Sequence, residues 1–233
     1  MPAARAEPAA ALERLDAITR RLRRECPWDR EQDERSIVPH TVEEAYELAD
    51  AAHAGDDEKL LDELGDVLFQ VYFLALLLEE RGAGDLAAVA DHCREKLIRR
   101  HPHVFGEAEA ESAGAVLERW DEIKRTQERG GEIFGELPET LPAALYARKL
   151  LRRAAGASQA EPPEGAEAPE VCAAAGRLRS LPTDDSTRDE RFAATGDLLF
   201  GAIAAARDAG IDPELALRAR ANQFRAEVEA TND

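Results

Sequence analysis

The sequence predicts an all-α fold, and three observations support this prediction. Alanine and leucine dominate the apolar residues, aromatic residues make up only 5% of the chain, and apolar positions recur with helical spacing. Alanine and leucine favour helices, whereas β-branched and aromatic side chains favour strands. With 44% hydrophobic residues, the chain can bury a substantial core. We therefore expect a bundle of helices without a sheet.

The predicted helices follow one another along the first 153 residues. Their ranges are about 9–24, 41–54, 57–81, 85–100, 112–125 and 141–153. Pro27 ends the first helix, because proline biases its predecessor away from the helical conformation. Thr41 is a plausible N-cap of the next helix, in a capping box with Glu44. This box gives Glu44 a structural role that competes with any functional one.

The last third of the chain contains a weak internal repeat. The segment Thr195–Phe200 matches Leu64–Phe69, which suggests a duplicated helical unit. The acidic residues of the first copy are mostly missing from the second, since Ala194 stands where the first copy has Glu63. We therefore predict a first domain that keeps the acidic residues, a connecting helix with a linker, and a degenerate second copy with a role in packing. Their ranges are 9–128, 129–169 and 170–231.

Composition also bears on partners and compartment. The net charge of −18 argues against nucleic-acid binding, which requires a basic surface. The chain has three cysteines and no Cys-x-x-Cys pair, which suits reduced thiols in a cytoplasm. No segment reaches the roughly 18 consecutive apolar residues that a membrane-spanning helix needs. The expected protein is cytoplasmic, without a nucleic-acid or membrane partner.

Two pairs of acidic residues are the strongest candidates for a functional site. Glu44 and Glu47 lie three residues apart, as do Glu63 and Asp66, so each pair shares one face of a helix. Both pairs are equally distant from Gly55, in the turn between their helices. An antiparallel hairpin would therefore place Glu47 opposite Glu63 and Glu44 opposite Asp66. So many carboxylates at one level repel one another unless a cation lies between them.

The ligand types indicate which cation the hairpin would take. Carboxylate oxygens without nearby histidine or cysteine ligands favour Mg²⁺ or Mn²⁺ over Zn²⁺. Mg²⁺ held in this way usually keeps positions for water and substrate phosphates. The chain offers cations for such phosphates and an indole for a base. These residues are Lys59, Lys96, Arg99, Arg100, Lys124 and Trp120. Together they suggest a nucleoside triphosphate substrate.

Each of these features also has a simpler interpretation. Acidic pairs on helices often form a solvated face, and cations at a helix end can complement its dipole. Trp120 could belong to the core. A helical nucleotide-binding or interaction module without catalysis is therefore the alternative function.

Four motifs, taken in order, resemble the MazG family of nucleoside triphosphate pyrophosphohydrolases. They are Cys26-Pro27-Trp28-Asp29, Glu43-Glu44-Ala45-Tyr46-Glu47, Glu63-Leu64-Gly65-Asp66 and Lys96-Leu97-Ile98-Arg99-Arg100-His101-Pro102-His103-Val104-Phe105. The resemblance implies tandem all-α bundles in an intertwined dimer, which use Mg²⁺ to hydrolyse nucleoside triphosphates to the monophosphate and pyrophosphate. It also implies a housecleaning role in the nucleotide pool.

The resemblance further implies roles for individual residues. Glu44, Glu47, Glu63 and Asp66 match the metal ligands. Glu43 or Glu47 would be the general base, and this choice stays open. The nucleotide contacts would be Lys59, Lys96, Arg99, Arg100, Trp120 and Lys124. Because the second copy lacks the acids, we expect catalysis in the first copy.

Overall fold

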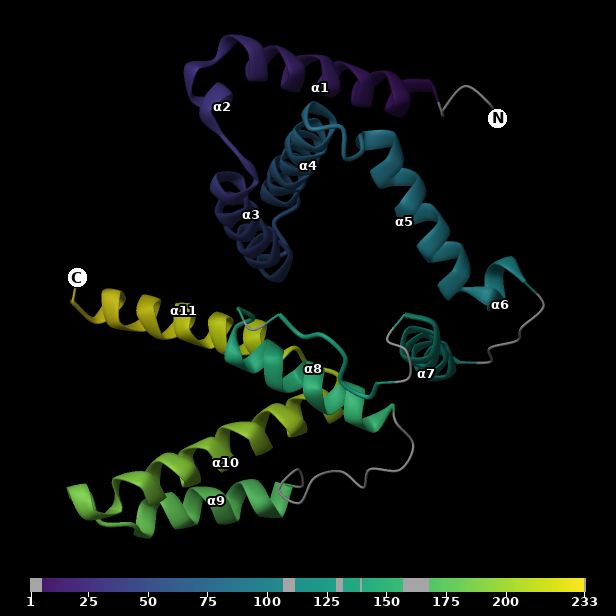
Figure 1. Cartoon of the computed structure of the whole chain (residues 1–233). Coiled ribbons are helices and arrows are strands. Elements are labelled where there is room, and N and C mark those ends of the chain that lie inside the picture. Colours follow the sequence, from purple (N-terminus) through teal and green to yellow (C-terminus); the bar gives the residue numbers. More distant parts are fainter. Residues whose placement is uncertain (1–5, 107–111, 129–131, 139, 157–167, 233) are drawn as a thin grey trace. The chain divides into compact units, whose positions relative to one another are not determined.

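The structure, a computed structural model, describes residues 6–106, 112–128, 132–138, 140–156 and 168–232. All regular structure in these ranges is helical, which confirms the predicted all-α fold (Figure 1). The chain divides into two compact units, Met1–Arg99 and Arg100–Asp233. Within the described ranges, no helix combines the length and the apolarity needed to cross a bilayer.

The first unit is organised around a helical hairpin. Its helices are α1 (Ala6–Glu25), α2 (Pro27–Glu31), α3 (Glu34–Ala54), α4 (Asp57–Glu80) and α5 (Leu86–Arg100). The last residue of α5, Arg100, belongs to the second unit. The hairpin consists of α3 and α4, which lie side by side (Figure 1). Gly55 ends α3 with a φ of 69°, a left-handed conformation that favours glycine. Asp56 then caps α4 by accepting a hydrogen bond from the Lys59 backbone N–H.

The start of α3 differs from the prediction. Thr41 is not an N-cap: the helix begins at Glu34, and the cap is Asp33, in a reciprocal capping box with Ser36. The prediction rested on the local Thr41–Glu44 pattern, whereas the helix extends further back and contains Pro39, a residue that usually interrupts a helix. Glu44 consequently lies mid-helix, and the capping role that competed with a functional one is excluded.

Ile37 explains why the helix extends through Pro39. Its side chain is fully buried with Phe73 and Leu77 of α4, and Phe69 and Leu74 pack against this cluster. Burying such a side chain is worth about 1.5–3 kcal/mol, which offsets much of the cost of an internal proline. The buried contacts thus fix the hairpin that carries the acidic pairs.

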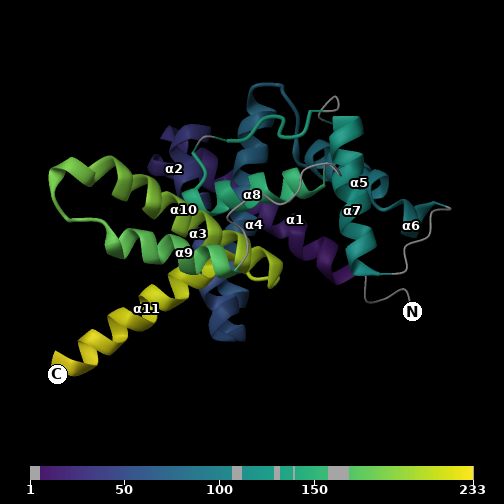
Figure 2. The same cartoon turned by 90° about the horizontal axis from the view of Figure 1, so that it is seen from below.

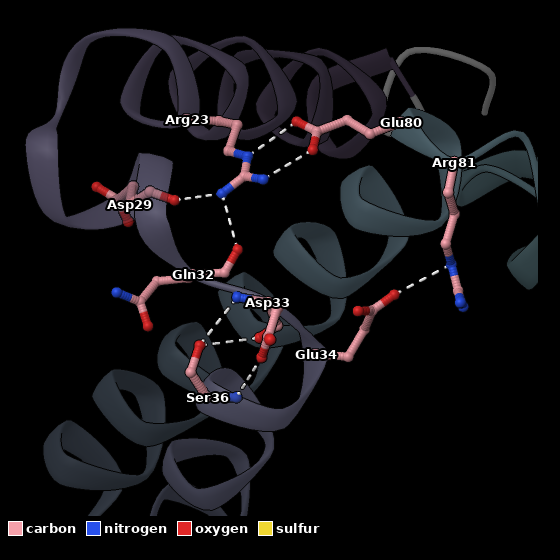
Figure 3. A network of polar contacts seen from close by, with 8 residues as sticks. All are labelled: Arg23, Asp29, Gln32, Asp33, Glu34, Ser36, Glu80 and Arg81. Atoms are coloured by element: carbon pink, nitrogen blue, oxygen red, sulfur yellow. Dashed lines mark hydrogen bonds and ion pairs between the residues drawn. The ribbon is translucent and has the colours of Figure 1, made fainter.

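Arg23 ties α1 and α2 to the end of α4. Its guanidinium donates to both carboxylate oxygens of Glu80, at 2.9 and 2.8 Å, and to the backbone carbonyls of Asp29 and Gln32 (Figure 3). It also lies over the ring of Phe73, 5.8 Å from the centroid. A single side chain therefore fixes the short helix α2 against the rest of the unit.

The second unit contains short helices followed by a second hairpin. Its elements are α6 (Pro102–Phe105), α7 (Ala113–Ile123), the π-helix η2 (Lys124–Glu128), α8 (Ala143–Ala155), α9 (Ala168–Ser180), the 3-10 helix η3 (Asp185–Thr187), α10 (Arg188–Asp208) and α11 (Pro213–Asn232). Helices α9 and α10 pack side by side, as both views show (Figures 1 and 2). Leu151 of α8 packs against Ala204 of α10, with Phe200 and Ile203 around them.

The predicted linker lies largely outside the described residues. It covers 154–169, of which 157–167 are not described. The predicted domain boundaries, 9–128, 129–169 and 170–231, therefore stay a prediction.

Candidate metal centre

Three acidic residues converge on the α3–α4 hairpin. Oxygen atoms of Glu44, Glu63 and Asp66, hereafter the carboxylate cluster, lie within 4.8 Å of one another. Glu44 comes from α3 and is half-buried, whereas Glu63 and Asp66 come from α4. Glu63 is only 4% exposed, and Asp66 is exposed. The cluster thus has one buried carboxylate and an open side.

Burial and neighbouring charges raise the pKa of two members of the cluster, Glu44 and Glu63. Burial raises the pKa of Glu44, and among the neighbouring charges that raise it further Asp66 acts most strongly. Burial also raises the pKa of Glu63, and here the strongest neighbouring charge is Glu47. These couplings agree with the predicted register, in which Glu44 lies opposite Asp66 and Glu47 opposite Glu63.

Lys59 is the nearest cation to the buried carboxylate. Its ammonium lies 3.8 Å from Glu63, one helical turn away on α4, and it lowers the pKa of Glu63. The net shift is nevertheless upward, so this lysine compensates only part of the repulsion. Lys59 also lines an open depression beside Gly65 and Asp66. It therefore lies where the prediction placed a phosphate contact.

The cluster suits a divalent cation. Its donors are hard carboxylate oxygens, close enough to share one ion. Burial and then repulsion from neighbouring carboxylates raise the pKa of Glu44 and of Glu63. Glu47 does not belong to the group of oxygens within 4.8 Å, although its charge acts on both Glu44 and Glu63. Glu43 is exposed and contacts His40 at 3.3 Å.

The predicted cations of α5 do not line the depression beside the carboxylate cluster. Lys96 is half-buried and Arg99 is exposed. Neither belongs to the residues that line the depression beside Asp66. The structure therefore does not gather these two cations around the carboxylate cluster, and their role as nucleotide contacts stays a prediction.

The remaining predicted contacts come together in the second unit. Lys124 lies over the ring of Trp120, 3.4 Å from its centroid, and the guanidinium of Arg100 lies 5.5 Å from the same centroid. Arg100 and Lys124 also line a cavity of about 470 Å³ together with three cations of α8 that sequence reasoning missed. These cations are Lys149, Arg152 and Arg153. Their spacing along α8 was the available signal, but it also fits simple dipole complementation.

Comparison with known protein families supports the sequence resemblance. Residues 32–105 match the family described as the MazG nucleotide pyrophosphohydrolase domain. This segment contains the whole carboxylate cluster and all of α3, α4 and α5.

Similar proteins extend over most of the chain. A nucleoside triphosphate pyrophosphohydrolase of Escherichia coli is 36% identical over 223 residues, which cover 91% of this chain and 84% of that protein. The nucleoside triphosphate pyrophosphohydrolase/pyrophosphatase MazG of Thermotoga maritima is 37% identical over 227 residues, which cover 94% of this chain and 84% of that protein. A nucleoside triphosphate pyrophosphohydrolase of Mycobacterium tuberculosis is 33% identical over 140 residues, which cover 59% of this chain and 43% of that protein. With this identity over nearly its full length, the chain belongs to the MazG family.

Proposed function

We propose that this protein hydrolyses nucleoside triphosphates between the α and β phosphates, releasing the nucleoside monophosphate and pyrophosphate. The observation that carries the proposal is the carboxylate cluster of Glu44, Glu63 and Asp66, which lies within the segment that matches the family. The names of the relatives from E. coli and T. maritima state the same activity. Removal of unwanted nucleotides from the cellular pool is the role we expect.

We assign Glu44, Glu63 and Asp66, with Glu47 beside them, to the binding of Mg²⁺ or Mn²⁺. The ion supplies positive charge that neutralises the polyphosphate and the departing pyrophosphate. The hairpin holds the carboxylate of Glu63 in place before substrate binds, because this residue is buried. Lys59 provides a cation at the edge of this group.

The chain itself supplies a general base and cations for the phosphates. The carboxylate of Glu47 or Glu43 accepts a proton from the attacking water, as its oxygen bonds to the α-phosphorus and the bond to the β-phosphate oxygen breaks. Lys59 contacts the phosphates beside the cluster. The other nucleotide contacts in this proposal are Lys96, Arg99, Arg100, Lys124 and Trp120. Because Lys124 covers one face of Trp120, we assign these two residues to phosphate rather than to the base.

Replacement of Glu63 tests the proposal. We expect Glu63→Ala and the near-isosteric Glu63→Gln to abolish Mg²⁺-dependent release of pyrophosphate from a panel of nucleoside triphosphates. Asp91→Asn, which changes an exposed acid on α5, is the matched control and should retain activity. Unchanged turnover in both Glu63 variants, with helical content retained, would show that the site is elsewhere.

We propose that residues 170–231 are a degenerate copy of the first hairpin, without a metal site. Ala194, which occupies the position of Glu63, is buried. Asp197, at the position of Asp66, pairs with Arg177 of the facing helix at 3.2 Å. A neutral ion pair thus stands where the first hairpin has repelling carboxylates. We assign this copy a role in packing.

The loss of acids in one hairpin gives the alternative function its support. A chain that has replaced one carboxylate set by Ala194 and Arg177 could use the other only to bind nucleotides or a partner. Binding of nucleotide and Mg²⁺ without release of pyrophosphate would establish this non-catalytic module.

We also propose that the protein is a homodimer. Leu61, Leu64, Leu68 and Val71 form an exposed apolar stripe along one face of α4, and Leu61 is 74% exposed. Their spacing of three and four residues is that of helices packed against each other. A second copy of the chain would cover this stripe, since exposed apolar faces of this kind mark interaction sites. The free thiols of Cys26, Cys93 and Cys172 support our placement of the dimer in the cytoplasm.

A further inference from the structure

We propose that Trp28 and His40 form the platform on which the nucleobase of the substrate stacks. This inference rests on the proposed function and adds the residues that hold the base. Trp28 belongs to α2 and His40 to α3, and their rings meet edge to face, with centroids 5.9 Å apart and planes at 65°. Trp28 is 51% exposed. About half of the surface of this residue is therefore accessible to a ligand.

The backbone that carries Trp28 is held rigidly although its ring is exposed. Arg23 donates to the carbonyls of Asp29 and Gln32, and these bonds fix α2 immediately after Trp28 (Figure 3). The side chain of Gln32 donates to the Trp28 carbonyl at 2.8 Å, and the side chain of Asp29 is buried. A ring held in place before binding loses little conformational entropy when a ligand stacks on it. These hydrogen bonds around Trp28 are more typical of a binding residue than of an exposed residue without a function.

His40 connects this platform to the carboxylate cluster. Its Nδ1 lies 3.3 Å from the carboxylate of Glu43. Glu44 follows His40 by four residues on α3, so the two lie on one face about one turn, or roughly 6 Å, apart along the axis. A nucleotide whose phosphates reach Glu44 thus has its base within reach of the two rings.

The platform lies on a different side of α3 from the exposed apolar residues of that helix. His40, Glu43 and Glu47 share one side by their spacing of three and four residues, whereas Val38 and Val42 share another. The neighbours of Trp28 on α3 are therefore polar and charged groups, not an apolar stripe. This setting favours a base attached to a charged polyphosphate over a second copy of the chain.

The chemistry of the platform indicates weak base selection. Stacking on an indole requires only a flat ring, so purines and pyrimidines are both accommodated. We expect the enzyme to accept several nucleoside triphosphates and to lose affinity for all of them when the indole is removed.

The kinetic test compares Trp28→Ala with Trp28→Phe. We expect Trp28→Ala to raise KM for nucleoside triphosphates roughly 5- to 150-fold, the range of base–aromatic stacking, whereas Trp28→Phe stays near wild type. Inhibition by inorganic tripolyphosphate with Mg²⁺, which has no base, should be unchanged in Trp28→Ala. Phe192→Ala, which removes another exposed aromatic ring, is the matched control. Equal KM values in Trp28→Ala and wild type would overturn the proposal, as would conversion of the Trp28→Ala oligomer to smaller species.

A binding test separates this inference from the proposed activity. The chain has two tryptophans, so in a Trp120→Phe background Trp28 is the only indole. A nucleoside monophosphate should quench its fluorescence, and inorganic tripolyphosphate should not. Quenching in this background, together with no turnover in the wild-type protein, would support the platform and refute the hydrolase. Turnover by the wild-type protein without quenching in this background would refute the platform and leave the hydrolase standing.

Discussion

Burial raises the pKa of Glu63 on α4, and Glu47 on α3 is the neighbouring charge that raises it most. The interaction of the two carboxylates is repulsive, and Lys59, 3.8 Å from Glu63, offsets only part of it. The metal-free hairpin therefore carries unfavourable electrostatic free energy at neutral pH. A divalent cation between the helices would remove it.

The contribution of Glu63 to the stability of the metal-free protein should fall as pH rises above about 4.5, the ordinary pKa of a glutamate. The pKa of Glu63 is raised in the folded state, so between 4.5 and that raised value the folded chain binds more protons than the unfolded chain. Stability then decreases with pH. Glu63→Gln removes this contribution, so the variant should gain stability relative to wild type across the same window. Urea unfolding in the presence of a chelator, from pH 4 to 8, measures the difference.

Mg²⁺ should make the wild-type protein more stable than Glu63→Gln, the reverse of their order without metal. The ion binds the folded hairpin and not the unfolded chain, so saturating Mg²⁺ should raise the Tm of wild type and flatten its dependence on pH. The Tm of Glu63→Gln should rise far less on addition of Mg²⁺. If Mg²⁺ shifts the Tm of both proteins equally, the ion binds elsewhere.

Arg23→Ala should destabilise the protein by about 2–4 kcal/mol, because it leaves the Glu80 carboxylate and two backbone carbonyls without their donor. The Arg23 side chain is only 16% exposed. Arg21→Ala is the matched control on the same helix. Its pair with Glu25 is 65% exposed on the arginine side and should contribute little to the free energy of unfolding. Chemical unfolding measures the free energy of unfolding of both variants. Similar losses in Arg23→Ala and Arg21→Ala would contradict the assigned role of Arg23.

The hairpin and its site could be predicted because they depend on local spacing. Glu44 and Asp66 are equally distant from Gly55, and a tight antiparallel turn leaves few other arrangements. The start of α3 could not be placed in the same way. Local rules treat Pro39 as a barrier, and only the burial of Ile37 against Phe73 shows why the helix continues through it.

The second unit shows the limit of such reasoning. Lys149, Arg152 and Arg153 read as an ordinary basic helix end, and the sequence does not show that they share a cavity with Arg100. This cavity depends on contacts between segments far apart in the chain. The contact of Lys124 with Trp120 is different, because the two residues lie four apart and this spacing places them on one helical face.

Leu68→Arg should convert the proposed dimer to a monomer. A charge in the middle of the apolar stripe would be buried without a partner in the dimer, at a cost of several kcal/mol. Phe192→Arg places the same charge at another exposed apolar position and should leave the dimer intact. Light scattering after size-exclusion chromatography measures the mass of each. A wild-type monomer, or a Leu68→Arg dimer, would refute the proposed interface.

Asp66 and Asp197 occupy matching positions in the two hairpins and allow a controlled comparison. Asp66→Asn should lower kcat/KM by roughly 100-fold or more, since even residues behind a metal ligand are worth about 10- to 100-fold. Asp197→Asn makes the same chemical change where the carboxylate faces Arg177 instead of other acids. It should leave metal-dependent turnover at the wild-type level and cost at most about 1 kcal/mol of stability, as an exposed ion pair does. Equal losses of activity in the two variants would show that the second hairpin contributes to the chemistry, and that its Arg177–Asp197 pair does not mark a lost metal site.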